Sequence, residues 1–247
     1  MIMLLKKRGG YLNQERVRKM SFSRGLIFLI AVVASFRPHA GIAEWKFAPG
    51  YSVEEISSKA TDGDADAQAT LGNYYLHGQG VSQNIQEAIK WYKKAADQNS
   101  VVGLSMYAFM LDREGQYIKS TPFWLKAAQL GSVKAQIEMG VKCAIGMEAG
   151  IAKDFVESAK WFQKAAEGGD SRGQRYLGLA YTNGIGVPQD FVQAHKWYNI
   201  SAASNDGERE EAAAARDKLA SKMTAPQIAE AQKLAREWKP NEAGSPR

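Results

Sequence analysis

The strongest constraint on the fold is a pattern of apolar, glycine and aromatic residues that recurs about every 35 residues. It is clearest in segment 172–203, where Leu177 belongs to an apolar stripe at helical spacing. A turn built on Gly184 and Gly186 follows, and a second helical stripe contains Trp197. Neither helix can bury its stripe alone, so we expect the two to pair and to stack on a similar hairpin.

The same order of residues occurs three more times in the chain. In chain order they are 67–96, 103–128 and 135–166. The first copy is well preserved, the second lacks the glycine pair, and the third has two extra residues between Gly146 and Gly150. One equivalent position is occupied by Leu71, Tyr107, Met139 and Leu177. The spacings of 36, 32 and 38 residues between these four are typical of an array of stacked helix hairpins.

Within one repeat the order is Ala-x-Ala-Gln, Leu-Gly, Tyr, Gly-x-Gly-Val, Asp, Ala, Trp and Ala-Ala, and the first and fourth copies match it almost throughout. This order resembles the Sel-one-like repeat family, which is related to the tetratricopeptide repeats. The resemblance covers about 65–238 and implies an all-α, right-handed α-solenoid of stacked antiparallel helix hairpins. We expect about four repeats with capping helices at both ends.

The chain accordingly divides into five predicted segments. They are a leader (1–43), an N-terminal capping segment (44–64), four repeats (65–206), a C-terminal capping helix pair (207–238) and a disordered tail (239–247). The short N-terminal capping helix starts at Ser52, with Glu55 three residues on. The tail contains proline, glycine and serine and has no periodicity.

Capping residues and glycines predict how each hairpin is built. Asn84, Asp154 and Asp190 precede the second helices, each with Glu or Gln three residues later, which predicts capping boxes. Three further glycines lie inside the first helices, where each costs about 0.5–1 kcal/mol relative to alanine. We expect them to admit a close partner helix; they are Gly72, Gly140 and Gly178, with Ala108 in the second repeat.

The second repeat is irregular because Pro122 falls where its second helix should already be running. Proline is tolerated in the first turn of a helix and disrupts later turns. We therefore expect this helix to start near Ser120 or Thr121 and to be short.

The positive charge of the chain is confined to its N-terminus. The formal net charge is +6, but residues 1–43 hold eight basic residues and one acidic residue, which leaves −1 for the rest. The repeats therefore lack the basic patch that nucleic-acid binding requires. The basic residues precede an apolar run of about 12 residues at 25–36 and small residues near Ala43, the layout of a cleavable secretory signal.

We therefore expect export to the periplasm or secretion, with cleavage near Ala43 and no stable membrane span afterwards. Met20 could be the true start, and an uncleaved anchor or a buried helix is the alternative.

Few residues have the arrangement that catalysis or metal binding requires. His77 and His195 lie in different repeats without metal-ligand spacing, and we interpret both as polar decoration. Cys143 takes an inward position and is expected to be a buried, inert thiol. The sequence predicts no enzyme activity, cofactor or metal. The alternative is a penicillin-recognising cell-wall enzyme or a peptidoglycan-associated binder, although S-x-x-K and K-T-G elements are missing.

The concave side of the array is the expected binding surface. One face of the first helices would form a ladder across the repeats, with an apolar floor and charged ends. Its predicted partner-binding residues are Asn73, Phe109, Asp112, Ile137, Val141, Arg175 and Leu179. The alternative is that the apolar members pack against the neighbouring repeat. The resulting hypothesis is a non-enzymatic periplasmic scaffold, an adaptor or regulator that binds another protein or peptide in its groove.

Overall fold

A computed structural model of the chain describes residues 52–146 and 149–241. Within these residues the structure is entirely helical, with no strands, which confirms the predicted fold class. The elements are α4 (Val53–Thr61), α5 (Ala65–His77), α6 (Ile85–Asp97), α7 (Val101–Arg113), α8 (Tyr117–Gln129), α9 (Val133–Ile145), α10 (Phe155–Glu167), α11 (Ser171–Asn183), α12 (Phe191–Ala202), α13 (Arg209–Ala220) and α14 (Ala225–Glu237). The predicted leader lies outside the described residues.

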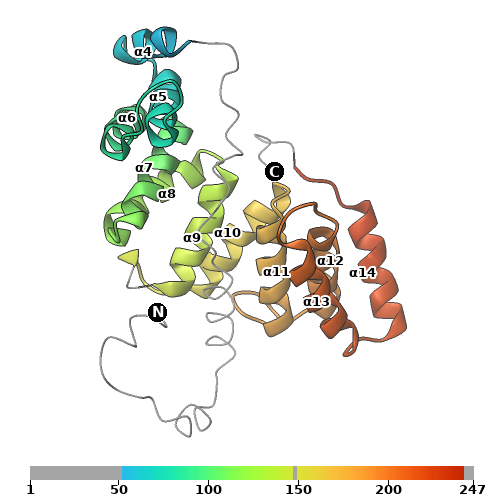
Figure 1. Cartoon of the computed structure of the whole chain (residues 1–247). Helices are drawn as coiled ribbons and strands as arrows, with labels where there is room; N and C mark the ends of the chain where they lie inside the picture. The colour runs from blue at the N-terminus through green and yellow to red at the C-terminus, as the bar shows by residue number, and fades with distance from the viewer. Residues whose placement is uncertain (1–51, 147–148, 242–247) are drawn as a thin grey trace, which may run out of the picture.

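Four hairpins stack in series along a curved array (Figure 1). They are α5–α6, α7–α8, α9–α10 and α11–α12, and each second helix also packs against the first helix of the next hairpin. The first helices start at 65, 101, 133 and 171, so their spacings are the 36, 32 and 38 residues predicted from the sequence. Leu71, Tyr107, Met139 and Leu177 are therefore the seventh residue of their helices.

Glycines inside the first helices make room for aromatic rings of the second helices, as expected. A Cβ atom on Gly140 would lie 2.5 Å from the Phe162 ring, and one on Gly178 would lie 2.8 Å from the Tyr198 ring. Gly72 has the same relation to the ring of Tyr92, at 2.7 Å. Glycine is thus required because an aromatic side chain occupies the space of its missing side chain.

The helix caps are confirmed at the second helices, but the reciprocal half of the predicted capping box does not form there. The Asp190 side chain accepts hydrogen bonds from the amides of Val192 and Gln193. The Asp190 amide, however, donates to the Tyr181 carbonyl of the first helix at 3.0 Å. Asn84 and Asp154 make the equivalent amide bonds to Tyr75 and Cys143. The N-cap amide is therefore already used in closing the hairpin, and complete boxes occur only in α4 and α14 among the described helices.

Two recurrent contacts join successive repeats. The glutamine of the Ala-x-Ala-Gln element donates to a carbonyl near the end of the preceding helix: Gln68 to Ala60 at 3.1 Å, Gln136 to Ala128 at 3.4 Å and Gln174 to Ala166 at 3.4 Å. The second glycine of each inter-helix turn packs on the first or second residue of an earlier helix. These pairs are Gly80 with Val53, Gly150 with Ile118 and Gly186 with Phe155. The repeat motif therefore specifies stacking as well as hairpin closure.

The prediction for the second repeat was wrong. Helix α8 starts at Tyr117 and has 13 residues, with Pro122 inside it. The Thr121 hydroxyl donates to the Tyr117 carbonyl at 2.9 Å, and the Ser120 hydroxyl oxygen lies at the same distance from that carbonyl. A short turn with Gly115 at φ 76° starts the helix early, and side-chain bonds support the turn that precedes the proline.

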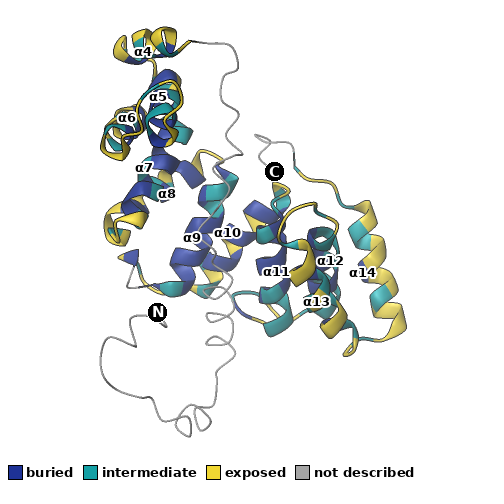
Figure 2. Cartoon of the chain, viewed as in Figure 1, coloured by how far each residue is buried: buried dark blue, intermediate teal, exposed yellow. Residues whose placement is uncertain are grey.

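The two helices of the predicted C-terminal capping pair both lie against the last repeat. Both α13 and α14 pack against α12, rather than against each other. Helix α13 continues the stack and presents charged residues outward, which suits the end of a solenoid. Helix α14 buries only Ala231 and is largely exposed in Figure 2.

The residues that follow α14 contact the array. The Asn241 amide donates to the Glu167 carbonyl at 2.7 Å, and the Trp238 ring meets the Trp197 ring edge-on at 5.7 Å between centroids. These contacts fasten the end of α14 to α10 and α12. Residues 242–247 lie outside the described residues.

Candidate functional site

Three of the predicted groove residues lie inside the packed array. Ile137 and Val141 are 0% and 3% exposed and belong to a core cluster that includes Phe162 and Leu177. Asn73 is 3% exposed and accepts a 2.7 Å hydrogen bond from the Tyr92 hydroxyl. The alternative interpretation, packing within and between repeats, therefore describes the environment of these three side chains.

The side chains of Phe109 and Leu179 remain partly exposed to solvent. Both are the ninth residue of their helices, α7 and α11, and both are half-buried. The Lys134 ammonium lies 5.0 Å from the centroid of the Phe109 ring, on the neighbouring first helix. These two apolar positions are the part of the predicted ladder that a partner could contact, and their role in binding stays a prediction.

Asp112 is the centre of a polar cluster that joins α7, α8 and α9. Its carboxylate accepts hydrogen bonds from the Trp124 indole at 2.6 Å and from the Lys142 ammonium at 3.0 Å. The Ser120 hydroxyl also donates to Asp112, and Lys142 lies 3.0 Å from that hydroxyl. The Lys142 side chain is only 7% exposed, so this ion pair is largely excluded from water. The predicted charged end of the ladder is thus a buried link between the second and third repeats.

Arg175, predicted as the other charged end of the ladder, already forms an ion pair within the chain. Its Nε atom donates to the carboxylate of Glu208, the N-cap residue of α13. The two side chains are 8% and 15% exposed. Arg175 therefore couples the fourth repeat to the helix that ends the stack.

Glu138 is a buried charged residue that the apolar stripe of α9 did not predict. It is 6% exposed on α9, and burial raises the pKa of its carboxyl to about 7, although Arg172 opposes this shift. The position of Glu138 within its repeat does indicate that it is buried. Glu138 occupies the position of the buried Met106 and Tyr176 in the flanking repeats, where a carboxyl group has to be desolvated.

Stability should respond to pH through Glu138. The folded-state pKa is raised, so the stability contributed by the protonated carboxyl is complete below the ordinary value of 4.5 and is lost as pH rises through about 7. We therefore compare the free energies of unfolding of Glu138→Gln and of the unsubstituted chain. The advantage of the variant should grow by roughly 2 kcal/mol as the pH rises from 5 to 8. Urea unfolding at several pH values measures this difference.

The buried His195 acts in the opposite direction, because burial lowers the pKa of its imidazole and its stabilising contribution is lost as pH falls. It is present in both proteins, so its effect cancels in the difference. A difference that stays constant from pH 5 to pH 8 would contradict the assigned burial of the Glu138 carboxyl.

The remaining candidate residues do not form a reactive site. His77 is exposed, whereas His195 is 2% exposed and its Nδ1 atom has no hydrogen-bond partner within the described residues. Cys143 is buried as predicted, and burial raises the pKa of its thiol to about 11. No group of three potential metal ligands occurs within residues 52–146 and 149–241.

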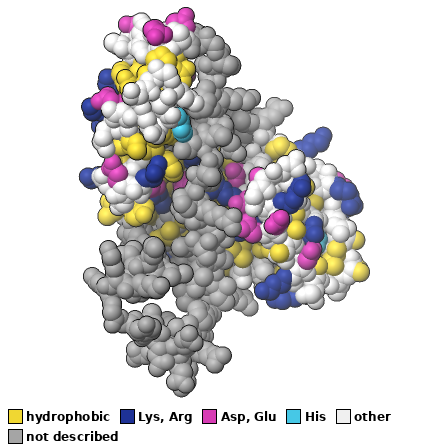
Figure 3. All heavy atoms as spheres, viewed as in Figure 1, with side chains coloured by type: hydrophobic (Ala, Val, Ile, Leu, Met, Phe, Trp, Pro, Cys, Tyr) yellow, Lys and Arg dark blue, Asp and Glu magenta, His cyan; other side chains and the backbone are white. Residues whose placement is uncertain are grey.

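The surface charge is mixed. On the face shown in Figure 3, basic and acidic side chains are interspersed over the described residues. This face therefore lacks the continuous positive field that would attract a phosphate backbone. Among the described helices, none has the length and apolar character needed to cross a bilayer.

Three segments match the Sel1 repeat, residues 65–100, 133–170 and 171–206. The chain is 47% identical over 51 residues to a sel1-like repeat-containing protein of Acanthamoeba polyphaga mimivirus, covering 21% of this chain and 9% of the relative. It is 29% identical over 189 residues to chitin synthase regulatory factor 3 of Schizosaccharomyces pombe, covering 68% of this chain and 20% of the relative. The chain thus spans a fifth or less of the length of these curated relatives.

Two solved structures share the fold. One is a protective antigen present in uropathogenic Escherichia coli strains and described as having an SLR fold; it has 32% identity and a TM-score of 0.67, over 75% of this chain and 40% of the antigen. The other is a Sel1 repeat protein from Oxalobacter formigenes, with 27% identity and a TM-score of 0.61, over 75% of this chain and 78% of that protein. Both similarities extend over most of the described hairpins.

Proposed function

The chain is a Sel1-repeat protein, and from this premise we propose that it is an exported, non-enzymatic scaffold that binds a segment of another protein. Solenoids of this kind serve protein–protein interaction through the extended surfaces of their stacked repeats. The proposed role is that of an adaptor or regulator in the bacterial periplasm.

The observation that carries this proposal is the unbroken series of hairpins, which places Phe109 and Leu179 at equivalent positions two repeats apart. Both are half-buried apolar residues, and the largely buried pair of Lys142 and Asp112 joins α7, which carries Phe109, to α9. A rigid floor with partly accessible apolar positions suits an extended or helical peptide, because little ordering is needed on binding.

Export and a regulatory role rest on separate support. The basic and apolar pattern of residues 1–43 has the layout of a signal peptide, and the rest of the chain is almost neutral. The name of the fission-yeast relative, chitin synthase regulatory factor 3, describes that protein as a regulator. We extend only the regulatory character to this chain, as part of the proposal.

Photo-crosslinking in living cells tests the binding surface. A photoreactive phenylalanine analogue at Phe109 or Leu179 should give a discrete crosslinked adduct with the same partner, because both positions line the proposed surface. The matched control is the same analogue at Val156, an apolar side chain that is 53% exposed at the start of a second helix. Equal adducts from all three positions, or none from Phe109 and Leu179, would contradict the proposal.

One observation bears on the cell-wall enzyme alternative. The Ser120 hydroxyl lies 3.0 Å from the Lys142 ammonium, a combination that can serve as nucleophile and base in acyl transfer. Ser120, however, is 0% exposed, and Lys142 is also paired with Asp112. A substrate carbonyl cannot reach this hydroxyl in the folded array, so we assign the pair to stability.

A further inference from the structure

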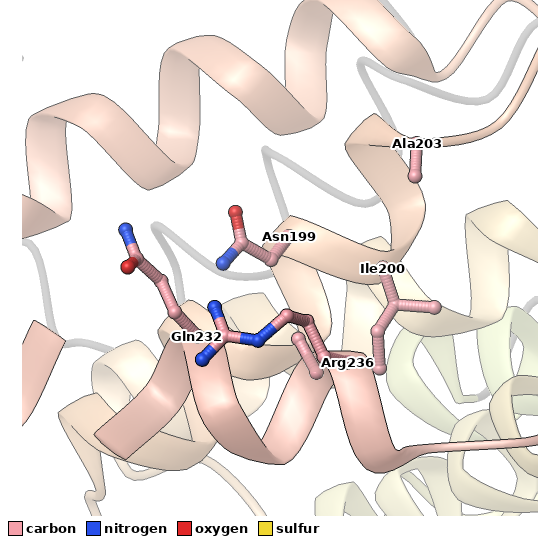
Figure 4. Close-up of a pocket in the computed structure, with 6 residues that line it drawn as sticks. Asn199, Ile200, Ala203, Gln232 and Arg236 are labelled. Atoms are coloured by element: carbon pink, nitrogen blue, oxygen red, sulfur yellow. The ribbon is translucent and has the colours of Figure 1, made fainter. Parts of the chain in front are cut away.

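A hollow of about 450 Å³ lies between α12 and α14, away from the first helices (Figure 4). Three residues from α12 and its C-terminal cap line it, together with three from α14: Asn199, Ile200 and Ala203, and Gln232, Ala235 and Arg236. The tryptophan pair Trp197 and Trp238 joins the same two helices, whereas the small side chains of Ala203 and Ala235 leave space between them.

The polar groups around this hollow are mainly hydrogen-bond donors. Figure 4 shows the side chains of Asn199, Gln232 and Arg236 extending into the same space. The Asn199 side-chain oxygen already accepts a 3.2 Å hydrogen bond from Arg216, so its amide nitrogen remains available as a donor. Arg216 is itself paired with Asp217 at 2.8 Å. Within the described part of the chain, the Arg236 guanidinium has no ion-pair partner, and no acidic residue lines the hollow.

We propose that this hollow binds the side-chain carboxylate of an aspartate or glutamate in a segment of a partner protein. A guanidinium presents two parallel donors that match a carboxylate, and the amides of Asn199 and Gln232 can donate to its remaining lone pairs. Ile200 and the two alanines provide apolar contact for the aliphatic stem. Ala203, Gln232 and Arg236 are exposed, so the hollow is open to a protein segment rather than shaped to enclose a small molecule.

This site is separate from the surface proposed for Phe109 and Leu179, because it is formed by α12 and by the C-terminal helix α14. Either site could be disproved without affecting the other. A segment bound here would bridge α12 and α14 and would add to the contacts that hold α14 against α12.

Nuclear magnetic resonance of the isotope-labelled full chain tests the site with a defined probe. The probe is the doubly blocked peptide acetyl-Ala-Ala-Glu-Leu-Ala-amide, whose only carboxylate is the glutamate side chain. We expect saturable shifts of the Arg236 guanidinium signal and of the Asn199 and Gln232 side-chain amides. The glutamine version of the peptide should bind at least about tenfold more weakly.

Paired variants separate a specific contact from general charge attraction. Arg236→Gln should weaken probe binding about tenfold, whereas Lys233→Gln, which removes the same charge from an exposed position on α14 outside the hollow, should change it less than about twofold. Absence of saturable shifts, equal binding of the glutamate and glutamine peptides, or equal loss in both variants would overturn the proposal. If the glutamine peptide with a free C-terminus bound more tightly than the blocked glutamate peptide, the site would recognise the carboxylate of a chain end. That result would overturn the choice of a side chain.

Discussion

Replacing Lys142 with alanine should lower the free energy of unfolding by about 3–5 kcal/mol, because an unpaired carboxylate would then remain in a largely buried site. The Lys142 ammonium lies 3.0 Å from both Asp112 and Ser120, and its side chain is 7% exposed. Asp112 would retain the Trp124 indole as a donor but lose its countercharge. Urea unfolding followed by circular dichroism measures the loss.

Lys160→Ala is the matched control. Lys160 forms a 3.2 Å ion pair with Glu157, but the two side chains are 63% and 40% exposed, so its removal should cost less than about 1 kcal/mol. The double variant Lys142→Met with Asp112→Asn should lose less stability than the sum of the two single variants, since neither partner then remains buried as an unpaired charge. Equal losses for Lys142→Ala and Lys160→Ala would contradict the buried ion pair.

The sequence was sufficient to predict the repeat register and most helix starts. The glycine–aromatic pairs, such as Gly140 with Phe162, are local consequences of one motif repeated at fixed spacing. The same regularity predicted that Asn84, Asp154 and Asp190 cap the second helices. Information of this kind is repeated along the chain, so each copy supports the interpretation of the others.

The buried charges were missed because each helix was interpreted by its own apolar stripe. Lys142 occupies the position of Met110 and Ala180 in the flanking repeats, both of which are buried. A charged residue at a position that is otherwise apolar indicates a buried ion pair, and Asp112 is its partner across the repeat boundary.

Two features of the fold depend on tertiary contacts. Helix propensity alone predicts a late start for α8 because of Pro122, whereas Ser120 and Thr121 support the preceding turn and the Asp112 cluster fixes it. The position of α14 depends on the contact between Trp197 and Trp238, which no local pattern specifies. Packing against distant residues overrides local preference in both cases.

Replacing Gly186 with alanine should cost about 3 kcal/mol in free energy of unfolding. The added Cβ atom would lie 1.9 Å from the Phe155 carbonyl oxygen, a backbone atom that cannot rotate away as a side chain can. Gly186 also has φ 72°, which disfavours any residue with a Cβ atom. The clash would push the fourth hairpin away from α10. Urea unfolding and the accessibility of the interface to hydrogen exchange should both report the change.

Gly115→Ala separates the cost of the positive φ from the cost of the steric clash. Gly115 has a similar φ of 76°, but a Cβ atom added there would meet no described atom within 4 Å beyond its own chain neighbours. It should therefore lose only the conformational contribution, about 1 kcal/mol. The difference of about 2 kcal/mol between the two variants measures how closely the turn of one repeat must approach the preceding second helix. If both variants lost the same stability, the second glycine of the turn would serve chain reversal alone. The stacking of repeats would then depend on the remaining contacts, which are the apolar core and the glutamine bonds from Gln68, Gln136 and Gln174.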